Sequence, residues 1–297
     1  IVVSNTTRTA FALNQARDVA LEWCAVGGGD VGVRLNSGNN LRVEHCVVVD
    51  ANTGVVVDNW DRSTNTVFPV INNNVLWNLG QSAIKISELH RATVMNNIMN
   101  ITGENYIYDL ADTANLVADY NALWLGTHGR VARRMQGGDR SRYPLVYETV
   151  GAWATSSSND LHSYDGDPLL VNPSNRIFHL KSRAGRWNPI AGSWTNDAQT
   201  SPLIDMGEPS AKTWTNEPAP NGQRLNVGLY GGTSLASKSE TNSALCLLTL
   251  NHGGVVTGPV ALNWLATGMA TGHTVRVEVS NDDGETWHLV VPSVSAT

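Results

Sequence analysis

The sequence predicts an all-β protein, in which a parallel β-solenoid is followed by an incomplete β-sandwich. Hydrophobic strand patterns return every 22 to 28 residues across 11–124, and Cys or Asn recurs at one corner of that repeat. No helical periodicity runs through it. A repeat of this length with strand signals is typical of stacked coils that bury a shared core.

Each predicted coil contains a hydrophobic strand, a polar corner, a second hydrophobic strand and a Cys or Asn corner. The last corner is occupied in turn by Cys24, Cys46, Asn74, Asn97 and Tyr120, at steps of 22, 28, 23 and 23 residues. Because side chains alternate along a strand, Val33, Val55 and Ile84 are expected to stack in one inward column. The corner asparagines are expected to form an amide ladder that satisfies backbone groups.

Three stretches depart from this repeat. The third coil carries an insertion at 58–69, and insertions of this kind often form loops on a binding face. The stretch 126–165 is expected to form a side loop or plug with one or two helical turns at 146–154. The Trp-bearing stretch 185–235 is expected to cover the solenoid's C-terminal end, whose apolar layer and strand edge need protection.

The chain therefore divides into a parallel β-helix over 1–235, a Ser-rich linker over 236–243 and four alternating strands over 244–297. The strands suggest an Ig or fibronectin-type sandwich, which usually needs about 100 residues. We therefore expect this domain to be partial, and the N-terminus to begin inside the repeat array. An Asp-box pattern at 280–287 predicts a hairpin in which Asp282 binds turn amides and Trp287 packs beneath.

Composition excludes several classes of protein. The 297 residues carry a net charge of −6 and only 15% charged residues, without a basic stripe, so nucleic-acid binding is not expected. No apolar run approaches about 18 residues, so no membrane span is expected. Cys24 and Cys46 are expected to be stacked free thiols rather than a disulfide, and no Cys/His spacing predicts a zinc site.

Four segments carry a resemblance to a known family. They are ADYNALW (118–124), NDLHSYDGDPLLVNP (159–173), SPLIDMGEP (201–209) and EPAPNGQRLNVGLYGGTSLASKS (217–239). With them, residues 10–240 resemble the right-handed, single-stranded parallel β-helix proteins of bacteria, the broad pectate-lyase-like superfamily. The resemblance implies a secreted or cell-surface protein with a polysaccharide ligand, because relatives include polysaccharide lyases and glycoside hydrolases.

Enzymes of the resembled kind bind glycans on the outer face of a parallel sheet. The outward column expected here is Ala12, Arg34, Val56, Lys85 and Tyr108, and a second column is Asn14, Asn36, Asp58, Ser87 and Leu110. A lyase needs a base for the C5 proton and a cation to neutralise the uronate. Lys85 or His90 could supply the base, and Arg34 the cation.

A glycosidase instead needs two carboxyl groups about 5 to 10 Å apart. Asp58 with Glu88 or Asp61 is the candidate pair. Trp60, in the insertion, is the candidate for stacking on a sugar ring, and Asp61 and Tyr108 are further candidates for substrate binding.

Other interpretations remain open. Ordinary solvated ion pairs would make this face a non-catalytic surface, adhesion or carbohydrate-binding scaffold, as a monomeric unit of a larger multidomain chain. Glu22 and Glu44 fall at like positions about 4.8 Å apart, which could bind calcium, although solvation or a nearby cation is favoured. No other cofactor is expected, and His162 and His179 are expected to be structural.

Overall fold

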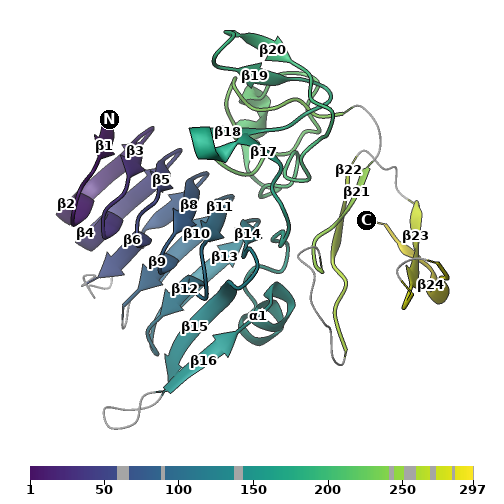
Figure 1. Ribbon diagram of the computed structural model, residues 1–297, viewed down its shortest axis with the longest axis horizontal. Helices are drawn as coiled ribbons and strands as arrows, with labels where there is room; N and C mark the ends of the chain where they lie inside the picture. Colours follow the sequence, from purple (N-terminus) through teal and green to yellow (C-terminus); the bar gives the residue numbers. More distant parts are fainter. Residues whose placement is uncertain are drawn as a thin grey trace.

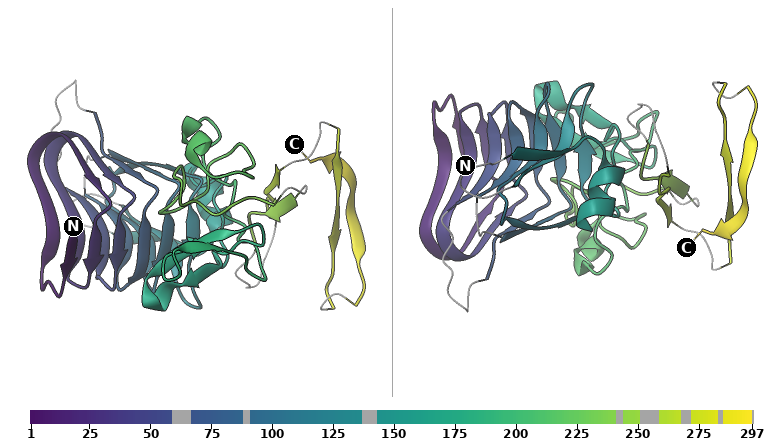
Figure 2. Two further views of the ribbon diagram at one scale, coloured as in Figure 1. Left: turned by 90° about the horizontal axis from the view of Figure 1, so that it is seen from above. Right: turned by 90° about the horizontal axis from the view of Figure 1, so that it is seen from below.

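The computed structural model describes residues 1–58, 67–87, 91–136, 143–240, 244–250, 259–267, 272–282 and 285–296. These described ranges are mostly β and contain one α-helix. As the sequence predicted, a parallel β-solenoid forms the N-terminal region and antiparallel strands form the C-terminus, where they make two separate two-stranded sheets (Figure 1). The packing of these sheets into an Ig or fibronectin-type sandwich stays a prediction. Successive coils stack in chain order along the solenoid axis (Figure 2).

Two sheets form the walls of the solenoid. The six-stranded sheet contains β1 (Val2–Ser4), β3 (Ala25–Gly27), β5 (Val47–Val49), β8 (Val75–Leu79), β11 (Ile98–Ile101) and β14 (Ala122–Trp124), all parallel. The ten-stranded sheet contains β2 (Thr9–Glu22), β4 (Val31–Glu44), β6 (Thr53–Asp58), β7 (Val70–Asn72), β9 (Ser82–Ile86), β10 (Arg91–Met95), β12 (Tyr106–Leu110), β13 (Asn115–Asp119), β15 (Arg130–Gln136) and β16 (Tyr143–Tyr147). The short strands of the smaller sheet follow the Cys or Asn corner and were not predicted.

The core confirms the expected inward columns. Val33 pairs with Val55, and Val55 with Ile84, and all three side chains are fully buried. Inward apolar residues recur at this position from coil to coil, so each coil covers the apolar face of the next.

The corner ladder is also confirmed, with one correction. The backbone N–H of Cys46 donates to Asn74 Oδ1 (2.8 Å), that of Asn74 to Asn97 Oδ1 (2.9 Å), and that of Asn97 to Asn121 Oδ1 (2.9 Å). Asn121, not Tyr120, is therefore the fifth ladder residue. Tyr120 has φ 55° and occupies the left-handed position that precedes the ladder residue in each coil.

The two stacked cysteines are free and buried, as expected. The Cys24 thiol donates to Glu22 O (3.3 Å) and the Cys46 thiol to Leu21 O (3.2 Å). Burial raises the pKa of Cys46 to about 12. Both thiols are therefore packing residues at the start of the ladder.

The C-terminal end of the solenoid is closed by 143–164, which corrects the expectation that 185–235 covers it. β15 continues the ten-stranded sheet, and β16 returns antiparallel to it. The predicted helical turns form α1 (Val150–Ser157), and Trp153 of α1 is fully buried in the solenoid core. The segment 159–164 then pairs with 118–123 like a further coil.

The region 166–240, which we call the flank region, lies along the side of the solenoid. It contains β17 (Leu170–Asn172), η1 (Pro173–Asn175), β18 (Ile177–Leu180), β19 (Arg186–Asn188), β20 (Ser193–Thr195) and η2 (Lys212–Asn216). Its apolar residues share a second core with the six-stranded sheet. Asn73 Nδ2 donates to Gly228 O (3.0 Å), and Gly228 N donates to Asn96 O (2.8 Å). Gly228 is required there, because its φ is +96° and a Cβ would lie 2.5 Å from Ile98.

The four C-terminal strands form two antiparallel pairs. They are β21 (Ala244–Leu247) with β22 (Trp264–Thr267) and β23 (Thr274–Val279) with β24 (His288–Ser295). In the Asp-box turn, Thr286 N donates to Asp282 Oδ1 (2.8 Å), as predicted. Trp287 is 59% exposed, so it is not the buried side chain that was expected beneath the turn. Among the described residues, none of the helices is long and apolar enough to cross a membrane.

Candidate functional site

The outward column of the ten-stranded sheet is well defined by its register. Pairing runs from Ala12 through Arg34, Val56, Lys85 and Asp109 to Arg133. We call the outward face around these residues the charged face. We call each of these paired positions a rung. Three rungs carry a cation, namely Arg34, Lys85 and Arg133, and one rung without a cation lies between each two of them.

Tyr108 does not belong to this face, contrary to the prediction. It pairs with Ile84, is 0% exposed, and its hydroxyl donates to Asp160 Oδ1 (3.3 Å) inside the solenoid end. A shift of one residue in register turns every side chain to the other face of the sheet. Asp109 therefore takes the outward position expected for Tyr108, and Leu110 is likewise buried.

The first charged group on this face joins Arg34 to Asp58. The guanidinium contacts Asp58 Oδ2, and the Ser87 hydroxyl donates to Asp58 Oδ1. The Arg34 and Asp58 side chains remain 35% and 18% exposed, so both groups reach solvent. Of the predicted catalytic residues, Arg34 and Asp58 are thus brought together.

The second charged group is centred on Asp109. Arg133 binds this carboxylate through two atoms, with Nε 3.0 Å from Oδ1 and Nη2 2.9 Å from Oδ2. Lys85 Nζ approaches Oδ2 at 3.7 Å from the other side. The Tyr106 ring lies beneath the Arg133 guanidinium, 4.9 Å from Cζ. This arrangement fixes Arg133, while Lys85 stays 48% exposed.

Sequence reasoning missed Asp109 and Arg133, although a signal was present. Steps of 24 residues separate Arg34 from Asp58, Lys85 from Asp109, and Asp109 from Arg133. One coil of the solenoid has about this length, so opposite charges at that spacing meet on adjacent rungs.

Four predicted site residues, Trp60, Asp61, Glu88 and His90, lie outside the described residues. The proposed glycosidase pair of Asp58 with Asp61 or Glu88 therefore stays a prediction.

The expected calcium position has a simpler explanation. Glu22 and Glu44 are register partners, as predicted, and Arg42 Nε lies 3.4 Å from Glu44 Oε2. The structure thus supplies the nearby cation that was the favoured alternative. Within the described ranges, no cluster of three or more His, Cys, Asp or Glu residues could hold a metal ion.

The two histidines expected to be structural stabilise contacts between segments. His162 Nδ1 lies 2.7 Å from Asp119 Oδ2, and its ring stacks on Tyr120 with centroids 5.0 Å apart. The Asp119 hydrogen bond raises the pKa of His162. His179 is buried and stacks on Tyr230 at 3.8 Å, and burial lowers its pKa to about 4.

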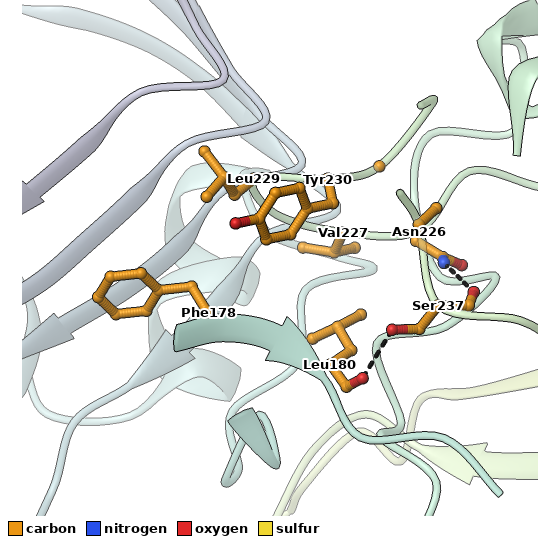
Figure 3. A pocket seen from close by; sticks show the side chains of 9 residues that line it. Phe178, Leu180, Asn226, Val227, Leu229, Tyr230 and Ser237 are labelled. Carbon is orange, nitrogen blue, oxygen red and sulfur yellow. Dashed lines mark hydrogen bonds between the residues drawn. The ribbon is translucent and has the colours of Figure 1, made fainter. Parts of the chain in front are cut away.

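A small pocket lies inside the flank region, between β18 and the segment 226–237 (Figure 3). It contains about 210 Å³ of empty space, including space open to solvent. The side chains of Asn226 and Ser237 are used internally, because Asn226 Nδ2 donates to Ser237 O (2.7 Å) and Ser237 Oγ donates to Leu180 O (2.6 Å). We interpret it as a packing gap and place the candidate site on the charged face.

A family model described as "Disaggregatase related" matches residues 145–207, about a fifth of the chain. The match covers the segment that closes the solenoid and the first part of the flank region, and it does not reach the charged face. No curated protein and no solved structure matches the chain.

Proposed function

We propose that the charged face binds an extended polysaccharide along the solenoid axis, in a protein that is secreted or displayed on a cell surface. One observation carries the proposal: Arg34, Lys85 and Arg133 occupy one outward column at alternate rungs. Two rungs correspond to roughly 10 Å, so the three cations span about 20 Å. A linear glycan is long enough to contact all three.

The chemistry of the charged face suits a sugar polymer. Its guanidinium and ammonium groups donate hydrogen bonds to hydroxyl or carboxylate oxygens, and Asp58 and Asp109 accept from hydroxyls. Cations outnumber carboxylates in the column and its ion pairs, although the whole chain carries a net charge of −6. We therefore expect glycans that carry uronate or other anionic groups to bind best.

Cleavage would need proton transfer at the same face. Lys85 is the candidate base of a lyase, and Arg34 or Arg133 would neutralise the uronate. For a glycoside hydrolase, Asp58 would be one of the two carboxyl groups, and its oxygens contact Arg34 and Ser87.

The second candidate is a binding scaffold without catalysis. It is favoured by the pairing on this face, where Asp58 and Asp109 each contact a cation. Both carboxylates already bind neighbouring protein groups, which leaves less of each available for a catalytic role. A surface or adhesion unit in a larger chain would need only the glycan-binding part of the proposal.

Binding is tested by titrating a panel of acidic and neutral polysaccharides into the wild type and into Arg34→Ala and Lys85→Ala. Loss of a charge-assisted contact of about 1.5 kcal/mol should weaken binding of an acidic glycan about tenfold. Arg42→Ala is the matched control, because Arg42 lies outside this column and pairs with Glu44. Equal losses in all three variants, or no binding across the panel, would reject the proposal.

The same samples distinguish enzyme from scaffold. Unsaturated products would identify a lyase, and new reducing ends without unsaturation would identify a hydrolase. Glycan binding without either product would favour the scaffold.

A further inference from the structure

The hairpin of β19 and β20 exposes an uncharged tip. Residues 189–194 are all exposed, with Ile190 83% and Trp194 38% accessible to solvent. In Figure 1 this hairpin lies at the outer end of the flank region, away from both solenoid sheets. Ile190 is the most exposed of the large apolar side chains in the described residues, and with Trp194 it gives the tip an exposed apolar surface that is a candidate for binding.

The tip is preorganised. Asn188 Oδ1 accepts hydrogen bonds from Ile190 N (3.1 Å) and Ala191 N (3.2 Å), and Gly192 N donates to Asn188 O (2.9 Å). These bonds hold the turn without any contact from the Ile190 side chain. A partner that buries Ile190 would therefore lose little entropy in ordering the turn.

The base of the hairpin is held as firmly. Arg186 Nε lies 2.8 Å from Asp197 Oδ2, and both side chains are nearly buried. Trp187 and Trp194 pair across the strands with ring centroids 6.0 Å apart. The tip is thus a rigid projection.

Basic side chains lie behind this projection. The stretch that leads into the hairpin contains Lys181 and Arg183, whereas the charge of Arg186 is balanced by Asp197. Lys238 Nζ lies 4.5 Å from the Trp194 ring centroid. Arg183 is 61% exposed, although Glu240 approaches it at 3.9 Å. An uncharged tip with cations behind it complements an anionic surface that has an apolar interior.

We propose that this hairpin binds an anionic lipid surface. Ile190 enters the boundary between headgroups and acyl chains, Trp194 lies at the interface, and Lys238 and Arg183 contact the headgroups. Indole rings favour that interface, and long basic side chains reach from apolar surface to charged groups. This inference is independent of glycan binding by the charged face.

A sugar is a poorer fit for the hairpin. A sugar ring stacks on a free aromatic face, whereas Trp194 has Lys238 over its ring and Trp187 against it. The exposed aliphatic side chain of Ile190 offers a glycan neither stacking nor a hydrogen bond. These contacts favour the lipid surface over a carbohydrate.

Co-sedimentation of the full chain with phosphatidylcholine vesicles, with and without phosphatidylglycerol, tests the proposal. We expect weak binding that increases with phosphatidylglycerol, and a loss of about tenfold or more for Ile190→Asp, because the substitution replaces an apolar contact by a charge. Ile190→Asp should fold normally because its side chain is exposed. Val67→Asp is the matched control, since Val67 is 53% exposed outside the hairpin, and it should bind like the wild type.

Two results would overturn the proposal. One is wild-type protein that sediments with neither vesicle. The other is Ile190→Asp that sediments as well as the wild type. If soluble dextran sulfate binds equally to both proteins while vesicles bind neither, the basic residues serve a soluble polyanion instead.

Discussion

The solenoid and the flank region stabilise their backbones in different ways. In the solenoid, the same contacts repeat in each coil, with inward columns and the corner ladder shared between neighbours. The flank region has only short strands and two 3₁₀ turns. Single buried side chains hold its loops. Glu217 Oε1, for example, accepts from Asn226 N (2.9 Å) and Gly232 N (2.7 Å).

This difference predicts how the stability of each region responds to amino-acid substitution and to pH. A solenoid spreads its stability over nearest-neighbour contacts, so its weak points are the ends and any residue that bonds both neighbouring coils. The flank region depends on a few buried polar groups, so its stability should change with their protonation.

The largest effect should come from Trp153→Ala at the closed end. Trp153 is fully buried in the solenoid core, and its Nε1 donates to Asp160 Oδ2 (3.0 Å). The cavity and the lost hydrogen bond should lower the free energy of unfolding by about 4 kcal/mol, measured by urea denaturation. Trp287→Ala, at a site 59% exposed, is the control and should cost less than about 1 kcal/mol.

Asn97→Ala should have the next largest effect, because Asn97 bonds the coils on both sides. Its Oδ1 accepts from Asn74 N, and its Nδ2 donates to Ile71 O (2.9 Å) and to Asn121 Oδ1 (3.1 Å). The buried groups left unpaired should lower the free energy of unfolding by about 3 kcal/mol. Asn52→Ala removes one exposed side-chain bond to Asp30 and should cost less than about 1 kcal/mol. Equal effects of the two substitutions would contradict the ladder's role.

Glu217→Gln should reveal the flank region's dependence on pH. Burial raises the pKa of Glu217 from 4.5 to about 7. The folded state therefore binds the Glu217 proton more tightly than the unfolded state, and that stability is present below about pH 4.5 and lost as pH rises through about 7.

Gln cannot ionise, so the variant should be more stable than the wild type by about 3 kcal/mol near pH 8.5 and similar to it near pH 4.5. Thermal unfolding at both pH values provides the measurement. A variant less stable than the wild type at the higher pH would show that Glu217 is ionised in the fold without penalty.

The smallest effect should come from His162→Gln. The hydrogen bond to Asp119 raises the pKa of His162 above its usual 6.5, so its stabilising contribution is present below that value and disappears as pH rises through the folded-state pKa. The difference in melting temperature between wild type and variant should therefore be larger near pH 5.5 than near pH 8. Asp119→Asn should remove the same pH dependence, and an unchanged profile would rule out the ion pair.

The sequence predicted much of the solenoid and less of its charged face. Arg34, Lys85 and Asp58 were recognised because the first coils align without ambiguity. The last coil can be aligned in two ways that differ by one residue, since both Ile107 and Tyr108 are apolar enough for an inward position. Only the pairing of Tyr108 with Ile84 places Asp109 outward.

By itself, the sequence determined that the coils stack, because apolar alternation at a constant repeat leaves each coil's inner face unburied until a neighbour covers it. Only the tertiary structure decided which segment closes the end and which lies along the side. Those placements depend on contacts such as Trp153 with Asp160 and Gly228 with Asn96. Residues far apart in the chain make the second of these contacts, and no local pattern records such a pairing.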